Sequence, residues 1–146
     1  MRHRYRKGVH VIKISVSALV AIHLIATLWH GNAHTDLSIG LPPLKNLYVY
    51  TVILAAPIVG AILTWTRFAR LGSAVFALAM LGALLFGVYH HYILISPDNI
   101  AHLPGGPAEA HSQFIRSAEL IAFIELSSAL FGFFAMGYQY AKSGHA

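Results

Sequence analysis

Histidine is the residue type in this sequence best suited to chemistry, and ten of the 146 residues are histidines. Four of them fall in the stretch YHHYILISPDNIAHLPGGPAEAH, residues 89–111, which also contains Asp98. Neutral imidazole and carboxylate groups are the ligands that Zn, Cu or Fe takes in a protein without thiolates, and this chain has no cysteine. The histidines are therefore the first place to look for a metal site.

The composition indicates which kind of protein has to position these side chains. The chain is 57% hydrophobic and 10% charged, whereas a soluble domain carries about 25% charged residues. Lipid is a better solvent for such a chain than water, so we expect an all-α integral membrane protein in contact with the bilayer. The net charge of +5 is concentrated ahead of the first apolar segment. That position is typical of a membrane flank and argues against binding of nucleic acid.

Four apolar segments approach or exceed the roughly 20 residues that cross a bilayer as a helix. We predict a single membrane domain over residues 1–146, folded as a four-helix bundle with short connections. Pro57 lies inside the second segment and is expected to bend it, because proline lacks a backbone donor. The predicted transmembrane helices cover about residues 9–29, 47–65, 71–95 and 113–140, and the outer loops cover residues 31–46 and 97–112.

The distribution of Lys and Arg predicts the orientation of this bundle. Most bases fall in the N-terminal arm, in the short turn with Arg67 and Arg70, and at Lys142 near the C-terminus. Only Lys45 and Arg116 fall on the opposite side. Both termini are therefore expected in the cytoplasm, and the membrane that we expect is the bacterial inner membrane.

The N-terminal segment has one competing interpretation. A basic arm, an apolar core and the small residues of Gly31-Asn32-Ala33 resemble a signal peptide with its cleavage site. The apolar run is long for a signal core, however, and it carries His23. We therefore expect a retained helix.

The predicted topology gathers six histidines at the outer face of the bundle, because both longer loops meet there. We expect His30 to pair with His90 or His91, since these residues end two helices at the same depth. His90 and His91 are about 100° apart on a helix, so at most one is expected to face the core. Alternatively, the histidines are interfacial anchors beside a belt of Tyr and Trp. The candidate metal ligands are His30, His34, His90, His91, Asp98, His102 and His111.

Polar residues inside the apolar segments form a second group. His23 precedes His30 by almost two turns, so both point to nearly the same face. Glu119 is spaced to pair with Arg116, and Glu125 lies deeper. His23, Glu119 and Glu125 could form a polar relay, because ionisable groups at such depth usually face the bundle interior. In the simpler alternative, a neutral Glu125 bonds to His23 or to a hydroxyl and only joins the helices.

Sequence motifs for enzymes are absent: there is no phosphate-binding loop, no G-x-S-x-G and no H-E-x-x-H. Haem is less favoured than a bare ion, because His23 has no partner histidine at its own depth. The leading hypothesis is therefore a membrane protein that binds a transition metal (Cu, Zn or Fe) at its extracytoplasmic face. A structural or accessory subunit of a larger membrane complex, or a homo-oligomer, is the alternative. An enzyme that uses the bound metal is the third hypothesis, and binding is favoured over catalysis.

Overall fold

The computed structural model describes residues 2–143, with side chains from residue 7 to residue 141. All regular secondary structure in that part of the chain is helical. The symbol η denotes a π-helix, in which each backbone hydrogen bond joins residues five apart instead of four apart as in an α-helix. The elements are α1 (Arg2–Asp36), α2 (Pro43–Tyr48), η1 (Val49–Ala55), α3 (Ala56–Thr64), α4 (Ala69–Val88), η2 (Tyr89–Ile93) and α5 (Ala108–Ser143).

Four helical segments are long and apolar enough to cross a membrane, which confirms that part of the predicted fold class. Their outer surface is apolar: Ile25, Phe123 and Leu130 expose 69%, 69% and 63% of their area. Exposed apolar area of this extent is typical of helices that contact lipid. The four segments are Lys7–Asp36, Pro43–Thr64, Ala69–Ile93 and Ala108–Ala141.

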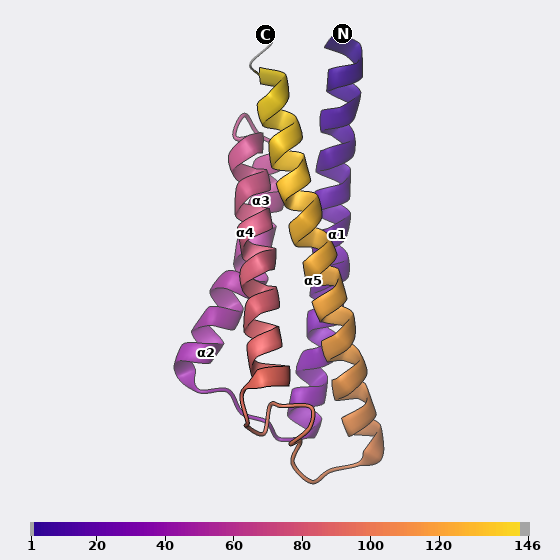
Figure 1. Cartoon of the computed structure of the whole chain (residues 1–146), viewed down its shortest axis with the longest axis vertical. Coiled ribbons are helices and arrows are strands. Elements are labelled where there is room, and N and C mark those ends of the chain that lie inside the picture. Colours follow the sequence, from indigo (N-terminus) through magenta and orange to yellow (C-terminus); the bar gives the residue numbers. More distant parts are fainter. Residues whose placement is uncertain (1, 144–146) are drawn as a thin grey trace.

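The four segments run along the long axis of the molecule as a bundle (Figure 1). Both chain ends lie at one end of the bundle, together with the short turn between α3 and α4 (Figure 1). The two longer connections, α1 to α2 and η2 to α5, lie at the opposite end. This is the up-and-down arrangement that short connections between antiparallel helices produce.

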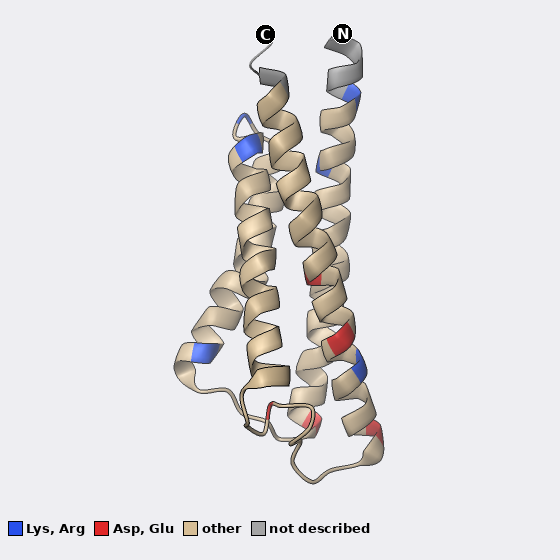
Figure 2. Cartoon of the chain, in the orientation of Figure 1, with Lys and Arg blue, Asp and Glu red and all other residues tan. Residues whose placement is uncertain are grey.

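The charged residues differ between the two ends (Figure 2). Lys7 and Lys13 lie in the half of α1 near the chain ends, and Arg67 and Arg70 lie at the α3–α4 turn. Acidic residues lie toward the other end, with Lys45 and Arg116. The side chains of Arg2, Arg4, Arg6 and Lys142, which also entered the orientation argument, lie outside the described residues.

The two longer connections are shorter than predicted, because α1 and α5 continue into the polar segments. The predicted loops covered residues 31–46 and 97–112, but the non-helical segments cover only 37–42 and 94–107. Polar side chains end an apolar pattern without ending a helix. Proline instead marks where two helices begin: α2 starts at Pro43, and α5 starts directly after Pro107.

Small residues allow the helices to approach α4 closely, as expected for helices in lipid. A Cβ atom added to Gly60 of α3 would lie 2.8 Å from the backbone nitrogen of Phe76. A Cβ atom added to Gly132 of α5 would lie 2.8 Å from the Cβ of Ala77. Any side chain at Gly60 or Gly132 would therefore push the helices apart.

Two π-helical segments interrupt the α-helices toward the end of the bundle opposite the chain termini. In η1 the backbone N–H of Ala56 bonds to the carbonyl of Thr51, and Pro57 has no N–H to continue the α-helical pattern. The segment before it, α2, leans away from the other helices (Figure 1). In η2 the N–H of Leu94 bonds to the carbonyl of Tyr89. Such wide turns occur frequently at functional sites.

Candidate metal centre

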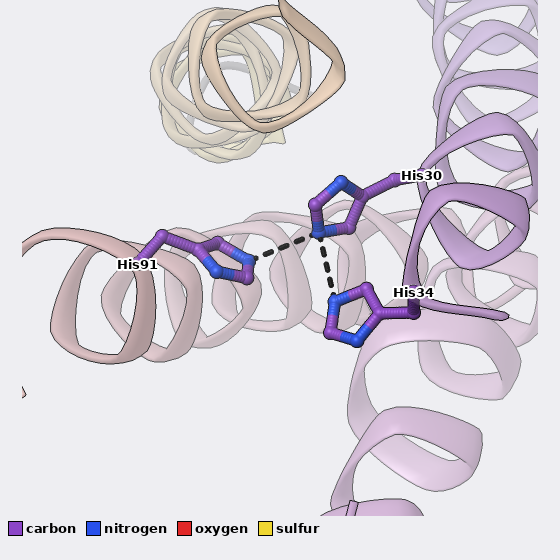
Figure 3. Close-up of side chains that lie close together, drawn as sticks. All are labelled: His30, His34 and His91. Carbon is purple, nitrogen blue, oxygen red and sulfur yellow. Dashed lines mark hydrogen bonds between the residues drawn. The ribbon is translucent and has the colours of Figure 1, made fainter. Parts of the chain in front are cut away.

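Three histidines, which lie toward the end of the bundle opposite the chain termini, point toward one another (Figure 3). His30 Nε2 lies 3.1 Å from His34 Nε2 and 3.2 Å from His91 Nε2. Each of the three residues offers a ring nitrogen within 4.8 Å of the others. Two nitrogens bound to one tetrahedral zinc ion lie about 3.3 Å apart when each bond is about 2.0 Å. The three side chains could therefore hold a metal ion.

The helices explain why these three side chains converge. His30 and His34 are four residues apart on α1, so their rings lie one above the other on one face. His91 comes from η2, and the loop after it folds back so that the Ile100 N–H bonds to the His91 carbonyl. Figure 3 shows the His91 ring pointing from its own helix toward the two rings of α1.

The hydrogen-bond partners determine which ring nitrogens carry protons. The Ser117 hydroxyl donates to a backbone carbonyl of its own helix, 2.7 Å away at Gln113, so it accepts a bond from His30 Nδ1 (2.8 Å). His91 Nδ1 donates to the carbonyl of Asp98 at 2.9 Å, since a carbonyl can only accept. In the neutral rings, His30 Nε2 and His91 Nε2 therefore carry lone pairs. These two lone pairs face each other, so a hydrogen bond from His34, a proton or a metal ion has to satisfy them.

The outer ring nitrogens are held in the way that metal ligands usually are. A metal-bound imidazole generally donates its second N–H to a carbonyl, a carboxylate or a similar acceptor. His30 donates to Ser117 and His91 donates to the Asp98 carbonyl. Both rings are thus oriented with Nε2 toward the centre of the cluster.

Asp98 supplies a negative charge beside the three imidazoles. One carboxylate oxygen lies 3.2 Å from His91 Nδ1 and 3.3 Å from His34 Nε2. Both oxygens are buried without a well-aligned hydrogen bond. Burial alone would raise the pKa of Asp98, but the neighbouring His91, His34 and His30 outweigh it and hold the pKa below its usual value. The carboxylate is therefore available as a fourth ligand or as a counter-charge.

Phe114 closes the cluster on the side of α5. Its side chain is fully buried, and its ring centroid lies 4.7, 5.0 and 5.4 Å from the centroids of His30, His34 and His91. An apolar wall of this kind excludes water from one side of a site and strengthens electrostatic interactions inside it.

A cavity of about 330 Å³ adjoins the cluster. Residues of α1, η1, α4, η2 and α5 line it, including all three clustered histidines and Asp98. Glu125 also lines it, and it follows Ser117 by eight residues, or about 12 Å along the helix. The cavity therefore leads from the histidines toward the middle of the bundle, and it leaves room for water or another small ligand on a bound ion.

The remaining predicted ligands are not brought to the cluster. His90 is buried, as His91 largely is, but His90 packs on Phe86 and donates to the Phe86 carbonyl (2.9 Å). Of the two adjacent histidines only His91 joins the cluster, in agreement with the expectation that at most one would face the core. His111 donates to the carbonyl of Pro104 at 2.8 Å, and His102 is exposed in the loop.

The predicted polar relay is present only in part. His23 and Glu125 are buried side by side, with His23 Nε2 3.1 Å from Glu125 Oε1. Glu119 and Arg116 are both exposed, and the structure records no ion pair between them. Nor does Glu119 line the cavity. Its position on α5 directs it to the outer surface, so it does not extend the pair of His23 and Glu125.

Sequence reasoning did not find Ser117 or Phe114. Serine and phenylalanine are frequent in apolar helices, and neither residue stands in a motif with a histidine. Only the packing of α5 against α1 shows that they contact the cluster.

The fold and the site define a class: a bundle of four long apolar helices with a three-histidine cluster near one end. Comparison of the chain with protein-family models, with curated proteins and with solved structures finds no match. The particular role of the protein therefore has to be argued from this geometry.

Proposed function

We propose that this chain is an integral membrane protein that binds a transition-metal ion through His30, His34 and His91 on the extracytoplasmic side. The observation that carries the proposal is the convergence of ring nitrogens from His30, His34 and His91, with His30 and His91 each held by a hydrogen bond on the far side of its ring. A metal ion at their centre would find a set of oriented ligands.

The donor set favours zinc or copper, with iron as a further candidate. Imidazole suits all three metals, and no thiolate is present to favour softer ions. Two imidazole nitrogens only 3.2 Å apart leave no room for a porphyrin between them, so a bare ion is favoured over haem. The Asp98 carboxylate offers a fourth position and offsets one positive charge.

The placement in a membrane is supported by the four long apolar helices with their apolar outer surface. The positive-inside rule assigns the end with Lys7, Lys13, Arg67 and Arg70 to the cytoplasm. The cluster lies toward the opposite end, where it would take up an ion from outside. Capture and release of that ion is the function that we propose.

The alternative of an accessory subunit required histidines that act as interfacial anchors. The ring nitrogens of His30, His34 and His91 point inward to one another, away from the surface of the bundle. This inward convergence favours the metal-binding proposal over the accessory one. A homo-oligomer is compatible with both the metal-binding and the accessory function.

The test is metal analysis of the protein purified in mild detergent without added histidine tag. The protein is equilibrated separately with Zn²⁺, Co²⁺ and Cu²⁺, and the bound metal is counted after removal of free ions. We expect one bound ion per chain. The absorption spectrum of the Co²⁺-loaded protein should be that of Co²⁺ with nitrogen ligands. The variants His34→Ala and His91→Ala should lose the ion.

The matched controls are His102→Ala and His111→Ala, which remove histidines outside the cluster. Both should keep one ion per chain. Absence of bound metal from the wild-type protein with all three ions would overturn the proposal. Equal loss of metal in the control variants would place the ion elsewhere in the chain.

A further inference from the structure

His23 and Glu125 form a buried polar pair below the histidine cluster. His23 is fully buried and Glu125 is 2% exposed. The hydroxyl of Thr27 donates to the His23 carbonyl (2.8 Å), so it can only accept from His23 Nε2 at 3.4 Å. His23 Nε2 therefore carries the proton and donates to Glu125 Oε1 at 3.1 Å. This tautomer leaves the second carboxyl oxygen, Oε2, free for another role.

Glu125 shares its cavity with the proposed metal ligands. Gly87 lies between them: a Cβ atom there would stand 3.8 Å from Glu125 Oε2 and 3.9 Å from the His91 ring. Because Gly87 has no side chain, the space between Glu125 and His91 stays open. An ion at the cluster and the Oε2 atom of Glu125 would therefore lie in the same cavity.

Charge balance links the two sites. Three neutral imidazoles do not compensate the charge of a divalent ion, and the single negative charge of Asp98 offsets only half of it. No Lys or Arg is found among the described residues that line the cavity. Glu125 is the second carboxyl group there, so its ionisation would complete the balance. Without the ion, a second unpaired carboxylate in the same apolar surroundings would be costly.

We propose that binding of a divalent metal ion at the cluster is coupled to loss of a proton from Glu125. This rests on the proposed metal site. In the metal-free protein, Glu125 carries a proton on Oε2 and accepts the His23 N–H on Oε1. When the ion binds, the O–H bond of Glu125 breaks, the electron pair stays on the carboxylate, and the proton leaves through the cavity to water. Release of the ion reverses each step.

Other titratable groups also line the cavity, so the experiment must single out Glu125. They are His30, His34, Asp98, His91, Tyr92 and Tyr50. From α1, His23 contacts Glu125 directly. Glu119, one and a half turns earlier on α5, is exposed and does not line the cavity, which makes it the matched control.

The experiment counts the protons released when Zn²⁺ binds. Calorimetric titration in buffers with different heats of protonation gives this number for the wild-type protein, Glu125→Gln and Glu119→Gln. The wild-type and Glu119→Gln proteins should release about one proton more per bound zinc than Glu125→Gln. At saturating Zn²⁺ all three should bind one ion per chain, with a weaker affinity in Glu125→Gln because the charge of Glu125 is lost. An equal number of released protons in all three proteins would overturn the coupling while leaving the metal site intact.

Infrared difference spectra of the wild-type protein provide a measurement that does not depend on a variant. Addition of Zn²⁺ should remove the carbonyl band of a protonated carboxyl group, and this change should be absent from Glu125→Gln. A wild-type spectrum without such a loss, although Zn²⁺ is bound, would also overturn the coupling. Failure of the wild-type protein to bind Zn²⁺ would overturn the proposed zinc site and the coupling together.

Discussion

His30 and His91 face each other through their Nε2 atoms, which are 3.2 Å apart. Each ring is fixed from behind, His30 by the hydroxyl of Ser117 and His91 by the carbonyl of Asp98. Neither ring can turn its N–H toward the other without losing a hydrogen bond. The fold thus holds two ring nitrogens where both could bind one metal ion, and the following predictions depend on that arrangement.

Zn²⁺ should stabilise the folded protein against heat. An ion that binds only the folded state at about 100 times its dissociation constant adds about 2.7 kcal/mol to the free energy of unfolding. Thermal unfolding in detergent, with Zn²⁺ and then with excess chelator, measures the difference. The stabilisation should vanish in His34→Ala and remain in His102→Ala. An unchanged unfolding temperature of the wild-type protein would contradict a site formed by the folded bundle.

Ser117→Ala should weaken metal binding although Ser117 is not a ligand. Its hydroxyl accepts the Nδ1–H of His30 and thereby directs Nε2 to the cluster. Loss of such an orienting partner typically lowers metal affinity by about 10- to 100-fold. Competition with a chelator of known affinity measures the change. Ser127→Ala on the same helix is the control and should leave the affinity unaltered; a similar loss there would point to a general disturbance of α5.

Asp98→Asn should also weaken metal binding, because it removes the negative charge nearest to the cluster. The substitution keeps the size of the side chain, and the backbone carbonyl that holds His91 stays in place. We expect a loss of affinity for Zn²⁺ of about 10- to 100-fold. Asp36→Asn, at the exposed end of α1, removes the same charge from the same end of the bundle and serves as the control. Equal effects of the two substitutions would indicate a long-range effect of net charge.

Gly60→Ala should destabilise the bundle. The added methyl group would meet the backbone of Phe76 at 2.8 Å, and a backbone cannot rotate away as a flexible side chain can. The expected cost is about 1–3 kcal/mol, as in other overpacked cores. Gly137→Ala meets nothing within 4 Å and should instead stabilise α5 by about 0.5–1 kcal/mol. Unfolding in denaturing detergent compares the two; equal stabilities would show that α3 and α4 can separate without cost.

The sequence alone determined the helical class and the general position of the histidines. Long apolar runs predict helices because only a helix satisfies its backbone hydrogen bonds without water. Their number and the positions of the loops then place His30, His34 and His91 toward the same end of the bundle. The ends of α1 and α5 were less accurately predicted, since polar residues end an apolar segment but can continue a helix.

Only the tertiary structure decided which histidines meet. His91 points to the cluster while its neighbour His90 bonds to its own helix, because adjacent residues of η2 point in different directions and its rotation turns His91 inward. His111 is held by the loop, and His102 is exposed. Glu125, and not Glu119, lines the cavity because the rotation of α5 turns only one of them inward. The spacing of residues in the sequence determines the angle between their side chains on one helix. The rotation of each helix relative to the others depends on side-chain packing between residues that are distant in the sequence.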